Sequence, residues 1–313
     1  MEEIVCNVCQ SDDTVVLYEG RDRLHGLGGP FKLVKCQQCG LIYLNPRPTR
    51  EEMGRYYPPD YEPYAQDVER AKGLLSGLDY RYGVAKRCRT ITKGKEPGRI
   101  LDVGCGAGHF LNGMKQRGWQ PFGTEVSEEA ATYARERFGL EVFVGELEEA
   151  ELPAAYFDAI TLWHVLEHLH DPLASLMEIS RLLKDGGLLV FAIPNWHSLD
   201  ARLFGEFWVG LDVPRHLYVF PRPALEKLLA RAGLKIVETE CFFGGHGAFA
   251  LSWRFFLEEK MPQKALRECL LWLSYTKLAR FIASPYFYLV DKLGGGPIIT
   301  LTCVKQGNTD WQD

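Results

Sequence analysis

The feature that most constrains the fold of this chain is a glycine-rich turn that follows an apolar run ending in an acid. Residues 99–103 read Arg-Ile-Leu-Asp-Val, and residues 104–108 read Gly-Cys-Gly-Ala-Gly. Alternate glycines let the backbone approach a ligand closely and adopt dihedral angles closed to other residues. A helix-like pattern with Phe110, Leu111 and Met114 comes next. This order predicts a strand, a tight turn and a helix, which together form a nucleotide-binding corner.

A second acid follows at a spacing that suits a bound nucleoside. The apolar run 119–124 ends in Glu125, and a carboxylate there can accept hydrogen bonds from both hydroxyls of a ribose. The turn has the spacing Gly-x-Gly-x-Gly after Asp102, unlike the Gly-x-Gly-x-x-Gly of dinucleotide enzymes. S-adenosylmethionine has no phosphate and carries an ammonium and a sulfonium. An acid beside the turn therefore suits this cofactor better than a dinucleotide.

Four motifs, in this order, resemble those of class I S-adenosylmethionine-dependent methyltransferases. They are the glycine turn with Glu125, Tyr-Phe-Asp-Ala-Ile-Thr at 156–161, His-Val-Leu-Glu-His-Leu at 164–169 and Leu-Leu-Lys-Asp-Gly-Gly at 182–187. The resemblance implies a methyl-transferring enzyme, and a Rossmann-like domain with another ligand is the alternative. It also implies a set of cofactor contacts: Asp102, Gly104, Cys105, Gly106, Gly108, Glu125, Val126, Glu146, Leu147, Trp163 and His164.

The core alternates between strand-like and helix-like patterns from Arg99 to about Cys241. Such alternation predicts an α/β fold, with a mostly parallel sheet covered by helices on both faces. A Rossmann-like sheet of seven strands fits the family. We expect strands at 99–103, 119–124, 141–144, 157–162, 187–193, 234–241 and 297–304, and helices near 107–117, 127–138, 172–183 and 223–232.

Two Cys-x-x-Cys pairs precede this core. Cys6 and Cys9 form the first pair, and Cys36 and Cys39 form the second. Four soft ligands without a fifth candidate predict a closed, structural Zn²⁺ site. A disulfide is the poorer interpretation inside a cell, and a redox role stays open. The strand-like segments between the pairs predict a small zinc ribbon.

The chain divides into a zinc-binding module (1–48), a linker rich in proline and tyrosine (49–96), the cofactor-binding core (97–241 and 297–305) with a substrate lid (195–221), and a helical cap (242–296). In the linker, Thr49 and Glu52 suggest the start of a helix. Tyr56, Tyr57, Tyr61 and Tyr64 either pack on the core or line the mouth of the site. The module, the Asn-Pro-Arg-Pro-Thr link and these tyrosines resemble a subset that includes sugar-nucleotide C-methyltransferases.

The lid carries the candidate catalytic residues Arg215 and His216. An imidazole titrates near neutrality, so His216 can remove a proton from the acceptor as the methyl group arrives. In the similar sugar C-methyltransferases a histidine of this segment is the suggested base, although a glutamate usually precedes it. Arg215 would suit an anionic acceptor, or it pins the lid to Asp212 or Glu167. His168 is a further catalytic candidate, or it forms a structural pair with Glu167.

The Asn/Asp-Pro-Pro-aromatic motif of enzymes that methylate nucleobase amines or glutamine amides does not follow the fourth strand. This leaves oxygen, carbon or small-molecule amine acceptors. A net charge of -5 without a basic stripe counts against nucleic acid as a partner. We therefore expect methyl transfer to a small molecule, a sugar nucleotide or another glycan or lipid precursor. The alternatives are an O-methyltransferase for a quinone-like or polyketide phenol, and a zinc-ribbon RNA methyltransferase.

The start of the sequence and the cap bear on location and partners. Met-Glu-Glu-Ile has no positive leader, and no apolar run reaches the ~18 residues of a membrane span, so we expect a cytoplasmic protein. The apolar residues of 242–296 follow helical spacing. They indicate a packed cap or dimer surface, or an amphipathic segment in peripheral contact with a membrane. A monomer and a homodimer are both consistent with this pattern.

Overall fold

The computed structural model describes the fold of residues 1–57, 74–93, 95–241 and 245–306. Its largest element is a seven-stranded sheet with the order β10-β11-β8-β7-β4-β5-β6. The strands are β4 (Arg99–Val103), β5 (Gln120–Glu125), β6 (Glu141–Val144), β7 (Phe157–Trp163), β8 (Leu183–Pro194), β10 (Leu234–Glu240) and β11 (Ile298–Lys305). Strands β6, β5, β4, β7 and β8 pair in parallel, and β11 runs antiparallel between β8 and β10. The expected seven-stranded Rossmann-like fold is confirmed.

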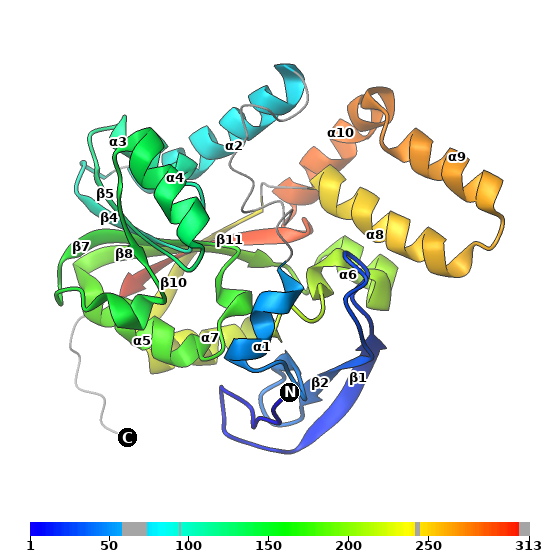
Figure 1. Ribbon diagram of the computed structural model, residues 1–313, viewed down its shortest axis with the longest axis horizontal. Coiled ribbons are helices and arrows are strands. Elements are labelled where there is room, and N and C mark those ends of the chain that lie inside the picture. Colours follow the sequence, from blue (N-terminus) through cyan, green and yellow to red (C-terminus); the bar gives the residue numbers. More distant parts are fainter. Residues whose placement is uncertain (58–73, 94, 242–244, 307–313) are drawn as a thin grey trace.

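Helices cover both faces of this sheet. Helices α2 (Leu74–Thr92), α3 (His109–Lys115) and α4 (Glu128–Phe138) lie on one face, and α5 (Pro172–Leu182) and α7 (Arg222–Arg231) lie on the other (Figure 1). Central strands are buried along almost their whole length because both of their faces are covered, as in β7. Local caps fix the helix starts, since Ser127 caps α4 and Asp171 caps α5. The expected spans differ from these by a few residues, with β8 beginning four residues earlier.

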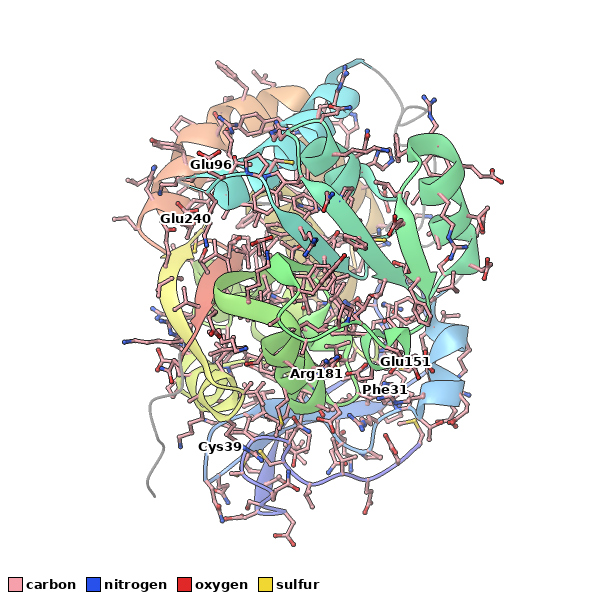
Figure 2. The ribbon with its side chains drawn as sticks, turned by 90° about the vertical axis from the view of Figure 1, so that its left-hand side faces the viewer. Phe31, Cys39, Glu96, Glu151, Arg181 and Glu240 are labelled. Atoms are coloured by element: carbon pink, nitrogen blue, oxygen red, sulfur yellow. The ribbon has the colours of Figure 1, made fainter. Side chains whose placement is uncertain are left out.

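The N-terminal module forms a second, smaller sheet that includes a strand of the lid. Its order is β1 (Thr14–Gly20), β2 (Phe31–Cys36), β3 (Ile42–Leu44) and β9 (Tyr218–Val219). Figure 2 shows Phe31 and Cys39 of this module below the large sheet. Because β9 pairs with β3, the module and the lid are built as one unit. The sequence did not predict this pairing.

The remaining segments are helical. In the linker, α1 (Arg50–Met53) begins with the expected capping box of Thr49 and Glu52. The lid contains α6 (Leu199–Phe204) and two short 3-10 turns. The cap consists of α8 (Gly245–Lys260), α9 (Lys264–Ser274) and α10 (Lys277–Lys292), which project to one side of the sheet (Figure 1). Within the described residues, every helix is too short or too polar to span a membrane.

Candidate active site

A pocket of about 970 Å³ lies at the carboxyl ends of the parallel strands β4, β5, β6 and β7. Open α/β sheets bind their ligands at this edge. All of the residues that the sequence marks for the cofactor line the pocket, as do His168 and His216. Arg215 does not belong to its wall. The structure thus gathers the expected cofactor residues and two of the three expected catalytic residues around one space.

The backbone conformation and close packing of the turn between β4 and α3 require glycine at several positions. Gly104, Gly106 and Gly108 all have a positive φ, which disfavours other residues. A Cβ atom on Gly104 would lie 2.7 Å from the Val165 side chain, and one on Gly108 would lie 2.6 Å from Leu140. Both distances are too short for carbon atoms, so the turn packs closely as well as bending sharply. The backbone of the turn can therefore approach a ligand closely.

Glu125 closes the turn from the end of β5. Its Oε2 accepts a hydrogen bond from the Gly106 N–H at 2.8 Å, and its Oε1 accepts one from the Ser127 N–H at 2.9 Å. Burial raises the pKa of this carboxyl, although the backbone donors oppose the shift. Each oxygen keeps a further lone pair beside the pocket. The carboxylate is therefore held ready to accept hydrogen bonds from two adjacent hydroxyls.

Asp102 is a second, more deeply buried acid at the end of β4. Thr161 donates a hydrogen bond of 2.5 Å to its Oδ1. Burial raises the pKa of Asp102 to about 7. A cationic group in the pocket would favour the charged carboxylate, because opposite charges lower the pKa of an acid. The ionisation of Asp102 is thus poised to respond to a bound cation.

The far end of the pocket is closed by the linker. Glu146 and Leu147 follow β6, and the Glu146 carboxylate pairs with Arg50 of α1. Met53 and Tyr57 also line the pocket, whereas Tyr56 is buried against Phe31. One linker tyrosine therefore reaches the site and its neighbour packs on the module. Tyr61 and Tyr64 lie outside the described residues.

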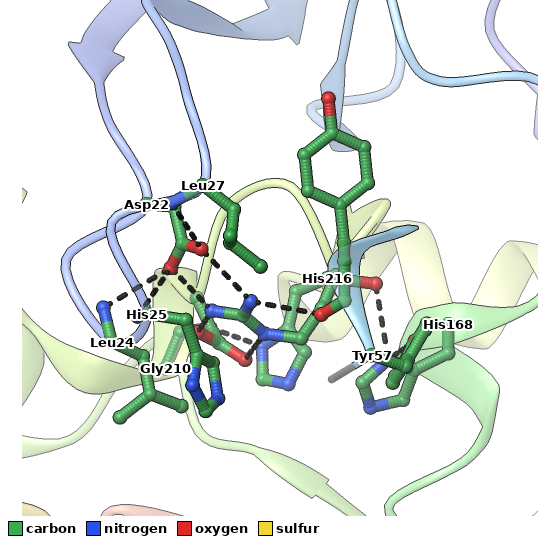
Figure 3. Close-up of polar contacts among 11 residues, drawn as sticks. Asp22, Leu24, His25, Leu27, Tyr57, His168, Gly210 and His216 are labelled. Carbon is green, nitrogen blue, oxygen red and sulfur yellow. Dashed lines mark hydrogen bonds and ion pairs between the residues drawn. The ribbon is translucent and has the colours of Figure 1, made fainter. Parts of the chain in front are cut away.

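Two histidines of the pocket wall stand next to each other. The ring centroids of His168 and His216 are 4.7 Å apart. The His216 Nδ1 lies 2.9 Å from the Gly210 carbonyl oxygen, which can only accept, so Nδ1 carries the proton. The Nε2 of a neutral His216 is then an unprotonated acceptor. Figure 3 shows these contacts.

His168 is held in a similar way from the lid. Its Nδ1 lies 3.0 Å from the Arg215 carbonyl oxygen and 3.0 Å from the Tyr57 hydroxyl. Burial, together with a smaller effect of the nearby His216, lowers the pKa of His168 to about 4. His168 is therefore neutral at neutral pH. A neutral imidazole can orient a substrate hydroxyl or bind a metal ion.

Glu167 lies beneath the two histidines. Its side chain is fully buried, its Oε1 is 3.3 Å from the His164 Nδ1, and its Oε2 has no partner among the described atoms. The donor atoms of Glu167, His168 and His216 lie within 4.8 Å of one another. This spacing could also accommodate a divalent cation. His164 has a φ of 60°, a costly conformation that is often found at functional sites.

Arg215 has a structural role. Its guanidinium is 0% exposed and contacts Asp22 and Asp212, each at 2.7 Å from Nη2. Its Nη1 also donates to the Tyr56 carbonyl at 3.2 Å. Because both carboxylates already hold the guanidinium (Figure 3), this geometry favours the alternative in which Arg215 pins the lid to Asp212 over the alternative in which it reads an anionic acceptor. Asp22 is a further partner that the sequence does not indicate.

The four cysteines of the N-terminal pairs converge. The Sγ atoms of Cys6 and Cys39 are 3.3 Å apart, and those of Cys9 and Cys36 are 3.5 Å apart. A disulfide needs about 2.05 Å between its sulfurs. Four sulfurs within 4.8 Å of one another are instead close to the spacing around a tetrahedral Zn²⁺ with Zn–S bonds of about 2.3 Å. The donor set fits a structural zinc site.

The sheet order, the glycine turn and the acid after β5 define a nucleotide-binding domain of the methyltransferase class. Residues 79–239 match the family described as Methyltransferase domain. This match covers just over half of the chain, and the chain belongs to that family.

Individual relatives are similar over the same region. The ubiquinone biosynthesis O-methyltransferase of Alkalilimnicola ehrlichii is 37% identical over 33% of this chain and 44% of its own length. The enzyme of that name from Azoarcus sp. is 35% identical over 44% of this chain and 65% of its own. The chain thus spans less than two thirds of these relatives. Phosphoethanolamine N-methyltransferase 2 of Haemonchus contortus, solved with S-adenosyl-L-methionine, shares the fold with a TM-score of 0.51 and 17% identity, over 85% of this chain and 62% of its own.

The pKa of Asp102 predicts how cofactor affinity depends on pH. If a cationic group binds near Asp102, binding expels the proton that the buried carboxyl holds below about pH 7. Affinity for S-adenosylmethionine should then rise between about pH 6 and about pH 8, by at most ~10-fold per unit. Calorimetric titrations at the two pH values test this. Asp102→Asn should bind more weakly and lose the pH dependence, and equal wild-type affinities would contradict the expectation.

The ion pairs of Arg215 predict a large effect of one module residue on stability. Asp22→Asn removes the buried one of the two carboxylates that pair with Arg215, and breaking a buried pair costs about 3–5 kcal/mol. Urea unfolding should show this loss. Asp12→Asn, at an exposed acid of the same module, is the matched control and should change the free energy of unfolding by less than about 0.5 kcal/mol. Similar unfolding midpoints for both variants would show that the pair is unimportant.

Proposed function

We propose that this chain is an S-adenosylmethionine-dependent methyltransferase that acts on a small-molecule acceptor. The observation that carries the proposal is the meeting of the glycine turn, two buried acids and two adjacent histidines in one pocket. In this arrangement Glu125 holds the ribose hydroxyls, and Asp102 lies beside the methionine ammonium. Leu147 and Glu146 flank the adenine.

We assign His216 the role of general base. The acceptor oxygen attacks the methyl carbon, the bond from carbon to sulfur breaks, and the sulfonium leaves as a neutral thioether. The Nε2 of His216 takes the acceptor proton, because its Nδ1 is already committed to Gly210. His168 and Tyr57 orient the acceptor from the adjacent wall. Holding the two reactants in line contributes ~7–11 kcal/mol, so the base adds to a larger positional effect.

We infer that the acceptor is the phenolic oxygen of a quinone-like ring. Two similar proteins carry the name ubiquinone biosynthesis O-methyltransferase. Because Arg215 lies in a buried ion pair, it is also not free to bind a phosphate of the acceptor, which was the role that the sequence suggested. The expected sugar nucleotide stays as the second candidate acceptor, since the resemblance of the N-terminal module favours it.

We further propose that Cys6, Cys9, Cys36 and Cys39 bind one structural Zn²⁺. The ion would be closed off by four thiolates and would take no part in the transfer. Its effect on the site would be indirect, through the sheet that the module shares with the lid.

Substitution of His216 tests the proposed chemistry. His216→Ala should lower kcat by about 10²–10⁴-fold, because a general base contributes that much. The affinity for S-adenosylmethionine should be retained, since His216 belongs to the acceptor end. Transfer of labelled methyl groups to a catechol-type quinol and to a sugar nucleotide gives the rates and identifies the acceptor.

The matched control is His197→Ala, at an exposed histidine near the start of the lid. It should retain the wild-type rate. Normal turnover by His216→Ala would overturn the base assignment, and transfer to the sugar nucleotide alone would overturn the quinone-like acceptor.

A further inference from the structure

The two last helices of the cap expose an unusual amount of apolar surface. We call residues 264–293, which form α9, α10 and the adjoining Leu293, the α9–α10 hairpin. Trp272 is 71% exposed and Phe281 is 76% exposed. Soluble monomers rarely expose contiguous apolar patches above a few hundred Å². The large apolar side chains exposed on the hairpin are Leu266, Trp272, Leu273, Tyr275, Leu278, Phe281, Ile282, Tyr286, Tyr288, Leu289 and Leu293.

Each helix of the hairpin packs against the rest of the protein through one side only. In α10 the partly or fully buried positions Ala279, Ala283, Phe287 and Val290 follow helical spacing, and Phe287 packs on Phe249 of α8. Helix α9 buries no residue completely. Figure 1 shows α9 as the helix farthest from the sheet, beyond α8 and α10. The outer face of the hairpin therefore points away from the rest of the described structure.

The charges of the hairpin favour an anionic surface over a second copy of the chain as the binding partner of this face. Residues 264–293 contain five basic residues (Lys264, Arg267, Lys277, Arg280, Lys292) and two acidic ones (Glu268, Asp291), a net charge of +3, whereas the whole chain carries -5. Two copies of the hairpin would bring like charges together. An anionic surface would be attracted. Trp and Tyr side chains, with an apolar body and a polar tip, suit the boundary between lipid headgroups and acyl chains.

We propose that the outer face of the α9–α10 hairpin binds the surface of an anionic lipid bilayer. The hairpin lies in the headgroup region and does not cross the membrane, because neither helix is long and apolar enough to span it. The exposed aromatic and aliphatic side chains enter the acyl boundary, and the net positive charge of the hairpin attracts the anionic headgroups. This inference rests on the hairpin alone and holds whichever acceptor the pocket takes.

Co-sedimentation with vesicles tests the proposal directly. The full-length protein is mixed with phosphatidylcholine vesicles or with vesicles that contain about one third phosphatidylglycerol. We expect at least about tenfold tighter binding to the anionic vesicles, weakened by added salt. Equal binding to both vesicle types, or no binding to either, would overturn the proposal.

Variants locate the contact. The double variant Phe281→Ser and Ile282→Ser should reduce binding to anionic vesicles by about tenfold or more, since it removes two side chains that enter the acyl boundary. Lys264→Glu should weaken binding to the anionic vesicles only. The matched control is Val237→Ser, which changes an exposed apolar residue on β10. It should bind like the wild type.

Light scattering after size-exclusion chromatography distinguishes membrane binding from dimerisation through the same face. A monomer in solution that binds anionic vesicles supports the proposal. A dimer that ignores vesicles and becomes monomeric in the Phe281/Ile282 variant would assign the face to a second copy and overturn it. Unchanged circular dichroism and unchanged affinity for S-adenosylmethionine show that each variant is folded.

Discussion

The arrangement of the acceptor site depends on one buried guanidinium. Arg215 joins the N-terminal module through Asp22, the linker through the Tyr56 carbonyl and the lid through Asp212. A charge without solvent exposure is tolerated only when it is fully paired. The backbone of Arg215 then holds His168, and the next residue is His216. The positions of both histidines follow from a set of ion pairs in which neither takes part.

This arrangement gives the N-terminal module a function in the site although none of its cysteines approaches the pocket. The module contributes three strands to a sheet whose fourth strand belongs to the lid. Asp22 lies in the same module, between its first two strands. If Zn²⁺ orders the module, it also orders Asp22, and through Arg215 it orders the loop that carries His216. The metal would act on catalysis through position.

The sequence predicts the parts of this structure that local patterns determine. Strand β4 and its glycine turn follow from an apolar run and alternate glycines, and the cofactor residues follow from motifs on single strand ends. The spacing of the two Cys-x-x-Cys pairs predicts that the four cysteines lie together. The role of Arg215 could not be predicted, because Asp22 is far away in the sequence and nothing in the pattern links the two. The same holds for Arg50 and Met53, which reach the pocket from a linker whose motifs indicate a helix start but no contact with the site. The helices of the cap were expected, but only the structure shows that their outer face is exposed.

The central claim is that the N-terminal module, through its proposed Zn²⁺, holds the lid in place. Hydrogen exchange measured by mass spectrometry on the full chain, before and after removal of Zn²⁺ by a chelator, tests it most directly. Metal removal should speed amide exchange in residues 209–219, where the Leu217 N–H donates to the Glu167 carbonyl, and leave β4 and β5 protected. If exchange rises in residues 1–48 while residues 209–219 stay protected, the module does not position the lid and the account is wrong.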